Sequence, residues 1–425
     1  MLDIRLVREQ PELVKERLAA RGGDDAARID ELLQIDADER REQTALQKLS
    51  ADRKSFSKQI GALRAKGEPS QDLEDRVSSL NDEIGMRELM LTGPSSLTAQ
   101  RRNLLLELPN LPHANAPVGK DASANPVVRT WGEKPLIAHP LDHVALGARH
   151  QLFDLERAAK LSGSGFICFT GQGARLERAL IQFMLDLHTR EHGYLEMSPP
   201  FLVRRDCMIG TTQLPKFEED MYGLENGAIF LAPTAEVPVT NFYREEILRA
   251  EDLPKKFVAY TPCFRREAGS AGRETRGIIR VHQFDKVELV KITTPETSYD
   301  EHEKLTADAE RVLQLLGLHY RVIELCTGDL GFGSAKTYDI EIWSPGQNAY
   351  LEVSSCSNFE DFQARRMNTR FKDAEGKNRF PHTINGSGLA LPRLFAALIE
   401  CGQTSDSAIR LPEKLQPYFG AAEIR

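Results

Sequence analysis

The residues best suited to chemistry lie in one stretch, 263–290, which reads CFRREAGSAGRETRGIIRVHQFDKVELV. Two apolar segments flank a loop rich in glycine and arginine, which predicts an antiparallel hairpin with a long polar tip. Arginine can hold a phosphate and an aromatic ring can stack on a base, so the return segment suits a nucleotide beside an ammonium-bearing substrate. Because strand side chains alternate between faces, one face is predicted to carry Arg280, His282, Phe284, Lys286 and Glu288.

The opposite face of the same segment carries Val281, Val287 and Leu289, which we expect to pack in the core. A solvated amphipathic strand would show the same alternation and is the alternative interpretation. The loop favours a binding site, because a solvated turn does not need four guanidinium groups and two glutamates balance only part of their charge. These loop residues are Arg265, Arg266, Arg273 and Arg276, with Glu267 and Glu274.

Length and composition limit the protein classes that fit. A chain of 425 residues with 28% charged residues is expected to form two globular domains. We expect neither secretion nor a membrane span, because no long apolar run occurs. Six scattered cysteines without a CxxC pair favour reduced thiols in a cytosolic protein. A net charge of -8 argues against indiscriminate nucleic-acid binding, although a local basic surface is compatible with it.

Residues 29–63 and 73–91 are predicted to form two long helices joined by a turn at 66–70, which reads KGEPS. Each helix has a narrow apolar seam at seven-residue spacing, which indicates an antiparallel coiled-coil arm. In the first helix Glu39, Glu42 and Arg53 interrupt the seam. Basic residues gather toward the tip with acidic residues among them, and charge alone favours a solvated coiled coil. The basic ones are Arg53, Lys54, Lys58, Arg64, Lys66 and Arg76.

Two features interrupt the helical pattern. Gly93 and Pro94 predict a kink or break near residues 92–96, because proline lacks the backbone donor and clashes with the preceding turn. Residues 108–135 are rich in proline and asparagine, which predicts an extended linker with a domain boundary near residue 112.

Three later segments offer polar groups for a site. Thr234, Ala235 and Glu236 place a hydroxyl and a carboxylate on a short loop, although such a pair is often a helix cap. Residues 349–355, AYLEVSS, present Glu352 and two serines, which suit magnesium, although alternation puts Ser354 rather than Ser355 on the face of Glu352. Residues 385–400, NGSGLALPRLFAALIE, predict a glycine-rich turn before an apolar helix whose free amides can face an anion.

The run FRREAGSAGRETRG followed by HQFDKVEL resembles motif 2 of the class II aminoacyl-tRNA synthetases, in the form found in seryl-tRNA synthetases. An amphipathic helix at 176–187 and a strand ending at Pro199 and Pro200 resemble motif 1, and residues 385–400 resemble motif 3. The resemblance covers nearly the whole chain. It implies an α+β fold with an amino-terminal antiparallel coiled-coil arm. Residues 1–111 would bind tRNA, and residues 112–425 would form the catalytic domain on an antiparallel sheet flanked by helices.

The resemblance implies ATP-dependent attachment of L-serine to tRNA(Ser) through seryl-adenylate, together with serylation of tRNA(Sec). It further implies a cytoplasmic homodimer that uses Mg²⁺. Two alternatives remain. A ligase that charges a carrier protein would lack the long arm, and a non-catalytic RNA-binding paralogue would lose motif residues. Pro94 and Pro392 depart from the family pattern and are the signs of a specialised copy as opposed to a housekeeping enzyme.

The resemblance also implies roles for individual residues. Arg265 and Arg393 are expected to be catalytic, Glu352 and Ser355 to hold magnesium, and Glu288 to recognise the serine hydroxyl. The serine pocket is expected to comprise Thr234, Ala235, Glu236, Glu288 and Ser387. The ATP site is expected to comprise Arg265, Arg266, Glu267, Arg280, Val281, Phe284, Glu352, Val353, Ser354, Ser355 and Arg393. No GxxxxGK[ST] loop and no HExxH pair supports a different nucleotide or zinc fold.

Overall fold

The computed structural model describes residues 1–268 and 276–425. The loop residues Arg273 and Glu274 therefore lie outside the described residues. The described chain divides into two compact units, the first formed by Met1–Ala19 and Gly23–Pro109 and the second by Ala20–Gly22 and Asn110–Arg425. No helix among the described residues combines the length and the apolar character that crossing a membrane requires.

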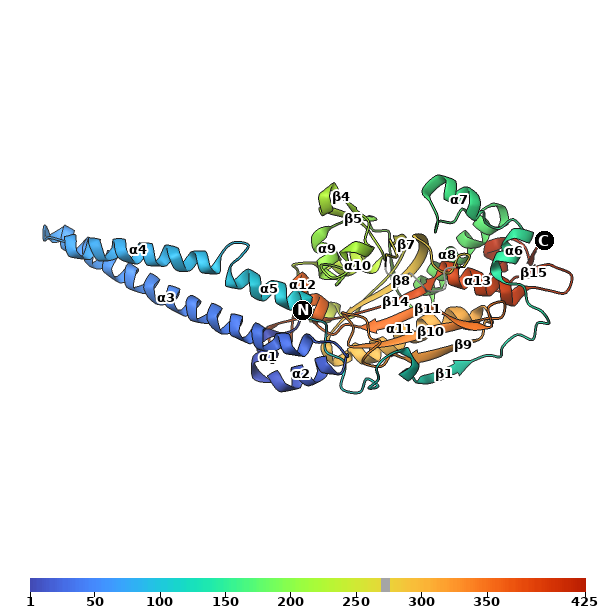
Figure 1. Ribbon diagram of the computed structural model, residues 1–425, viewed down its shortest axis with the longest axis horizontal. Coiled ribbons are helices and arrows are strands. Elements are labelled where there is room, and N and C mark those ends of the chain that lie inside the picture. Colours follow the sequence, from blue (N-terminus) through green and yellow to red (C-terminus); the bar gives the residue numbers. More distant parts are fainter. Residues whose placement is uncertain (269–275) are drawn as a thin grey trace. The chain divides into compact units, whose positions relative to one another are not determined.

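The first unit is helical, and its two longest helices form the antiparallel pair predicted from the seven-residue seams (Figure 1). Gly67 ends the first long helix in a left-handed conformation with φ of 73°, which a glycine adopts without steric cost. The helices are α1 (Ile4–Glu9), α2 (Pro11–Ala19), α3 (Arg28–Lys66), α4 (Gln71–Leu91) and α5 (Leu97–Glu107).

The predicted break in the second long helix is confirmed. Helix α4 ends at Leu91 and α5 begins at Leu97. Gly93 lies between them with φ of 91°, and the hydroxyl of Ser96 accepts the backbone N–H of Ala99 at 3.2 Å. Pro94 thus divides the returning helix in two, and a serine cap begins the second part.

The glutamates that interrupt the seam of α3 are buried members of ion pairs, which the sequence pattern did not indicate. Asp36 and Glu39 are each 1% exposed. Arg101 of α5 contacts Asp36 at 3.1 Å and Glu39 at 2.9 Å, and Arg87 of α4 contacts Glu42 at 2.6 Å. Part of the inter-helix contact is therefore ionic, because each buried carboxylate meets a guanidinium group from a returning helix.

The second unit contains an eight-stranded sheet in the order β1-β9-β10-β11-β14-β8-β7-β2. Its neighbouring strands are antiparallel except for the parallel pair β2 and β7. The predicted hairpin is confirmed as β7 paired with β8. The strands are β1 (Val127–Trp131), β2 (Leu195–Met197), β7 (Lys255–Phe264), β8 (Gln283–Thr293), β9 (Tyr320–Glu324), β10 (Lys336–Ser344), β11 (Ala349–Asn358) and β14 (His382–Ala390).

Helices α8, α11 and α13 pack on this sheet and enclose the main apolar core. The amphipathic helix predicted around Leu176–Leu187 is α8, and its apolar residues Leu176, Leu180, Phe183, Met184 and Leu187 are all buried. The helices of this unit are α6 (His143–Arg149), α7 (Leu155–Ser162), α8 (Gly171–Arg190), α9 (Arg205–Gly210), α10 (Glu236–Thr240), α11 (Ser298–Leu315), α12 (Phe362–Met367), α13 (Leu391–Gly402) and α14 (Gln416–Phe419).

Smaller elements surround this sheet. Three short sheets have the orders β13-β12-β6, β3-β5-β4 and β15-β16. Their strands are β3 (Leu202–Arg204), β4 (Gly223–Leu224), β5 (Ile229–Leu231), β6 (Ile247–Arg249), β12 (Arg370–Lys372), β13 (Asn378–Arg379), β15 (Ile409–Arg410) and β16 (Glu423–Ile424).

The predicted glycine-rich turn at residues 385–390 is wrong, because these residues belong to strand β14. Here glycine permits close packing. A Cβ at Gly386 would lie 2.7 Å from the Cys356 sulfur, and one at Gly388 would lie 3.0 Å from Nε2 of His188. Gly388 is also the extra residue of a β-bulge opposite β8. Helix α13 begins directly after the strand, with Pro392 in its first turn, where proline is tolerated.

Candidate active site

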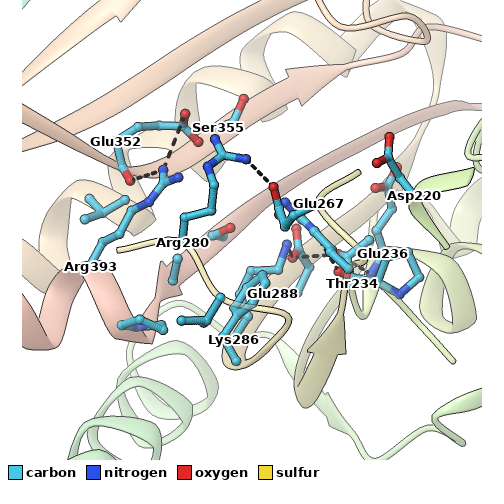
Figure 2. Close-up of a pocket in the computed structure, with 18 of the residues that line it drawn as sticks. Asp220, Thr234, Glu236, Glu267, Arg280, Lys286, Glu288, Glu352, Ser355 and Arg393 are labelled. Atoms are coloured by element: carbon cyan, nitrogen blue, oxygen red, sulfur yellow. Dashed lines mark hydrogen bonds and ion pairs between the residues drawn. The ribbon is translucent and has the colours of Figure 1, made fainter. Parts of the chain in front are cut away.

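A cavity of about 680 Å³ lies over the centre of the large sheet (Figure 2). Its walls come from the β7–β8 hairpin, from β11 and β14, and from the first turns of α10 and α13. A cavity of this size suits a nucleotide or another small ligand. The predicted site residues that line it are Thr234, Glu236, Arg265, Glu267, Arg280, Val281, Phe284, Glu288, Glu352, Val353, Ser355, Ser387 and Arg393.

Three predicted residues do not line the cavity. Ala235 is fully buried in an apolar cluster beneath it. The Arg266 side chain is exposed, and its backbone N–H donates to the carbonyl of Asp220 at 2.8 Å. Ser354 is buried, and its hydroxyl donates to the carbonyl of Ser387 at 2.7 Å. These residues support the walls of the cavity.

Alternation along β8 holds only where the segment is a strand. From Gln283 onward, Phe284, Lys286 and Glu288 line the cavity, while Val287 and Leu289 are fully buried in the core. Upstream of the strand, strict alternation fails, since Arg280 and Val281 both line the cavity, although Val281 is buried as predicted. His282 instead lies against Gly165 and Phe166, outside the lining, because residues 277–282 form turns and bends.

A β-bulge in β11 brings Glu352 and Ser355 to the same face. Ile340 pairs with Ser354 and Glu341 pairs with Glu352, so Val353 is an extra residue without a partner in β10. The bulge resets the alternation, and both side chains therefore line the cavity. Asp339 of β10 lies opposite Ser355, and its Oδ1 is buried without a hydrogen-bond partner among the described residues.

The inner end of the cavity is rich in carboxylates. Lys286 forms an ion pair with Oε2 of Glu288, and the Thr234 hydroxyl donates to the same oxygen at 3.1 Å. The carboxamide of Gln363 donates to Oε1 of Glu236 at 2.7 Å. Burial, and then the neighbouring Glu288 carboxylate, raise the pKa of Glu236 to about 7. This end can therefore bind a small cationic group.

The outer end of the cavity is rich in arginine, as Figure 2 shows for Arg280 and Arg393. Arg280 forms an ion pair with Glu267. Arg393 donates to the Glu352 carbonyl at 2.8 Å and lies 3.6 Å from its carboxylate. The Arg265 guanidinium lies 5.2 Å from the centre of the Phe284 ring. Guanidinium groups and an aromatic face together suit a nucleotide polyphosphate.

Sequence reasoning did not assign several lining residues. Lys286 was placed on the correct face of the strand but received no role. Asn385 is 6% exposed and lines the cavity beside Glu236. The interpretation of residues 385–390 as a turn concealed it, although strand alternation with Ser387 would have placed both on one face. Gln363 follows no recognisable motif and is identified only by its contact with Glu236.

Comparisons with known proteins match both units. Residues 1–112 match the family model of the seryl-tRNA synthetase N-terminal domain, and residues 220–401 match that of the tRNA synthetase class II core domain (G, H, P, S and T). The chain is 59% identical over 425 residues to the serine--tRNA ligase of Akkermansia muciniphila, covering 100% of this chain and 99% of that protein. The chain belongs to the seryl-tRNA synthetase family.

Other members of the seryl-tRNA synthetase family agree in sequence and in structure. The Geobacillus kaustophilus serine--tRNA ligase is 51% identical, with both chains covered completely. The crystal structure of seryl-tRNA synthetase from Pyrococcus horikoshii complexed with ATP superposes with a TM-score of 0.93, at 39% identity, over 100% of this chain and 99% of that one.

Membership of the family confirms the predicted α+β fold, the helical arm and the enzyme class. The chain is an ATP-dependent serine--tRNA ligase that forms seryl-tRNA(Ser). The carrier-protein ligase loses its support, because the arm that such proteins lack matches throughout residues 1–112. The non-catalytic paralogue loses its support as well, because the whole chain matches two serine--tRNA ligases at 59% and 52% identity.

Proposed function

We propose that the inner end of the cavity binds serine and that the outer end binds ATP. One observation carries this proposal: a single cavity has buried carboxylates, Glu236 and Glu288, at one end and the arginines Arg280 and Arg393 at the other. A serine ammonium group is complementary to the first end and a triphosphate to the second. The serine carboxylate and the α-phosphate then meet between the two ends.

The two chemical steps follow from this arrangement. A serine carboxylate oxygen attacks the α-phosphorus, a P–O bond forms, and the bond to the β-phosphate breaks with release of pyrophosphate. The terminal ribose hydroxyl of tRNA then attacks the acyl carbon, and AMP leaves. No side-chain nucleophile is required, so catalysis rests on positioning and on charge stabilisation. Arg265 grips the α-phosphate and aligns the serine carboxylate, and Arg393 stabilises the leaving phosphates.

Adenine and triphosphate recognition fall to the hairpin, β11 and α13. Phe284 stacks on the base with Val281 beside it, and Glu267 accepts from the adenine amino group. Arg280 and Arg393 bind the β- and γ-phosphates. Val353 contributes from the cavity lining, whereas Arg266 and Ser354 contribute through the hydrogen bonds that hold the wall, from the Arg266 N–H to Asp220 and from the Ser354 hydroxyl to Ser387.

Glu352 and Ser355 would hold a magnesium ion that arrives with ATP. Both offer oxygen ligands at the cavity, and the unpartnered buried oxygen of Asp339 beside them fits a third donor. Magnesium favours such hard ligands and keeps several waters. The ion would neutralise phosphate charge, while Arg393 keeps its contact with Glu352.

The serine pocket uses Thr234, Glu236, Glu288 and Ser387, with Ala235 packed beneath. Glu236 accepts the ammonium group and Glu288 accepts the hydroxyl. Alanine is rejected because it would leave buried polar groups unpaired. Ser387 lies on β14 opposite Glu288 of β8, which supports its place in the same pocket.

Residues 1–111 act as the tRNA-binding domain and residues 112–425 as the catalytic domain. Exposed lysines near the arm tip contact tRNA phosphates, which gives affinity with little sequence reading. The substrates are tRNA(Ser) and tRNA(Sec). The enzyme acts as a cytoplasmic homodimer whose interface includes α8 and β2.

The test combines two assays on the full chain. ATP–pyrophosphate exchange across the twenty amino acids should respond to serine alone. Serylation of tRNA(Ser) and tRNA(Sec) should fall strongly in a variant with Lys54, Lys58 and Lys66 changed to glutamate, while its serine-dependent exchange stays normal. Exchange with another amino acid would contradict the serine pocket. Unchanged serylation by the arm variant would contradict the role of the arm tip.

A further inference from the structure

In the part of the chain that the structure describes, the inner end of the cavity holds two carboxylates, Glu236 and Glu288, and a single cation that forms an ion pair with either. Among the described residues, Lys286 forms an ion pair with Glu288, and no lysine or arginine forms one with Glu236. All three side chains line the cavity and are at most 9% exposed. Figure 2 shows them grouped beside Thr234. When Glu236 is ionised, the described residues of this end therefore carry one negative charge in excess, and an amino-acid ammonium group brings the matching positive charge.

The two carboxylates differ in their protein partners and therefore in the ligand group that each can bind. Lys286 and the Thr234 hydroxyl both contact Oε2 of Glu288, so the other oxygen, Oε1, remains available to a ligand. A carboxylate that already has a cation gains little from a second one, yet it accepts a hydroxyl well. Glu236 receives the neutral Gln363 carboxamide at 2.7 Å, and it keeps the greater need for a cation.

We propose that Lys286 determines amino-acid selectivity by assigning different ligands to the two carboxylates. Lys286 holds Glu288 as the acceptor of the serine hydroxyl and leaves Glu236 as the sole ionic partner of the ammonium group. Without Lys286, both carboxylates attract the ammonium group, and an amino acid that lacks the hydroxyl binds nearly as well in either orientation. The inference rests on the proposed serine pocket.

A second buried lysine on the same strand provides a matched control. Lys291 of β8 is 1% exposed and pairs with Glu301 at 2.8 Å, but it does not line the cavity. Replacing either lysine with methionine removes a buried ion pair of β8, although Glu301 keeps a second partner, Lys304 of α11. Loss of an ion pair in β8 is therefore common to both variants, and only Lys286→Met changes the charge at the inner end.

The experiment measures serine- and alanine-dependent ATP–pyrophosphate exchange for Lys286→Met, Lys286→Arg and Lys291→Met. For Lys286→Met we expect the serine KM to rise and the serine-over-alanine ratio of kcat/KM to fall at least about tenfold, with the ATP KM within about twofold. Lys286→Arg should restore most of the ratio because it keeps the charge. Lys291→Met should keep the ratio even if its Tm falls.

An unchanged ratio in Lys286→Met, or an equal fall of the ratio in Lys291→Met, would overturn the inference. Glu288→Gln separates this failure from failure of the serine pocket. If Glu288→Gln lowers the ratio while Lys286→Met does not, only the role of Lys286 is wrong. If neither variant changes the ratio, the pocket assignment itself is wrong.

Discussion

The two ends of the cavity differ in both burial and charge. At the inner end, Glu288 is 2% and Lys286 7% exposed, whereas at the outer end the side chains of Arg393 and Glu352 are 24% and 48% exposed. Unpaired polar groups cost most where water is excluded, so the inner end is the place where a missing hydroxyl is detected. The outer end binds ATP, which is the same whichever amino acid is activated. High affinity therefore matters more there than selectivity.

The ends also differ in what must happen before a ligand binds. The outer arginines already have carboxylate partners, because Arg280 pairs with Glu267 and Arg393 lies beside Glu352. A triphosphate must therefore replace or join these partners. At the inner end no lysine or arginine among the described residues pairs with Glu236, so serine adds a positive charge there without displacing one. Selectivity and nucleotide affinity should therefore respond to different substitutions.

The largest effect is expected at Arg265, where the two ends meet. Arg265→Ala should lower the rate of ATP–pyrophosphate exchange by roughly a thousandfold, because the charge that develops at the α-phosphorus loses its partner. Arg266→Ala is the matched control, since its side chain is exposed and lies outside the cavity lining. If Arg266→Ala lost as much exchange activity as Arg265→Ala, a position in the cavity lining would not explain the role of Arg265.

Glu288→Ala should produce the next largest effect, confined to the inner end. The serine-over-alanine ratio of kcat/KM in the exchange assay should fall roughly a hundredfold, because the variant no longer accepts a hydrogen bond from the serine hydroxyl. The ATP KM should remain within about twofold. Equal losses of serine and ATP recognition would contradict the role of Glu288 as acceptor of the serine hydroxyl. They would also contradict the difference between the two ends.

A pH profile of serine binding should give a smaller effect. Burial raises the pKa of Glu236 to about 7, so this carboxyl loses its charge as pH falls through 7. Its neutral form attracts an ammonium group poorly, and the serine KM should rise as much as about tenfold for each pH unit below 7. Glu236→Gln should bind serine weakly at every pH and remove this dependence. If Glu236→Gln shows the same pH profile, a group other than Glu236 causes the titration.

The smallest effect is expected from Glu267→Gln at the outer end. This change breaks the ion pair with Arg280 but keeps an acceptor for the adenine amino group. Release of Arg280 and loss of the negative charge should offset each other, so the ATP KM should change no more than about threefold. The serine KM should not change. A large change in the serine KM would mean that the two ends are coupled.

The arm and the hairpin illustrate what local pattern in the sequence can predict. Pro94 predicted the break between α4 and α5, and alternation predicted the faces of Phe284, Lys286 and Glu288. In each case the physical cause lies within a few residues of the effect. The motif residues that carried the family resemblance are also contiguous in the chain.

What the sequence did not predict depends on partners far along the chain. The bulge at Val353 arises from pairing with β10, so it could not be inferred from β11 alone. The seam of α3 looks interrupted at Glu42 in the sequence because its partner, Arg87, lies 45 residues away. Gly386 and Gly388 are required by close packing against other elements. From the neighbouring sequence alone, the same glycines predict a turn.

Calorimetric titration of two variants, Glu288→Ala and Arg280→Ala, with serine and with ATP tests the division of the cavity most directly. We expect Glu288→Ala to lose affinity for serine and to keep its affinity for ATP, and Arg280→Ala to do the reverse. Both variants should keep the Tm of the unaltered chain within a few degrees. If each variant lost affinity for both ligands equally, the two ends would not be separate binding sites for serine and ATP.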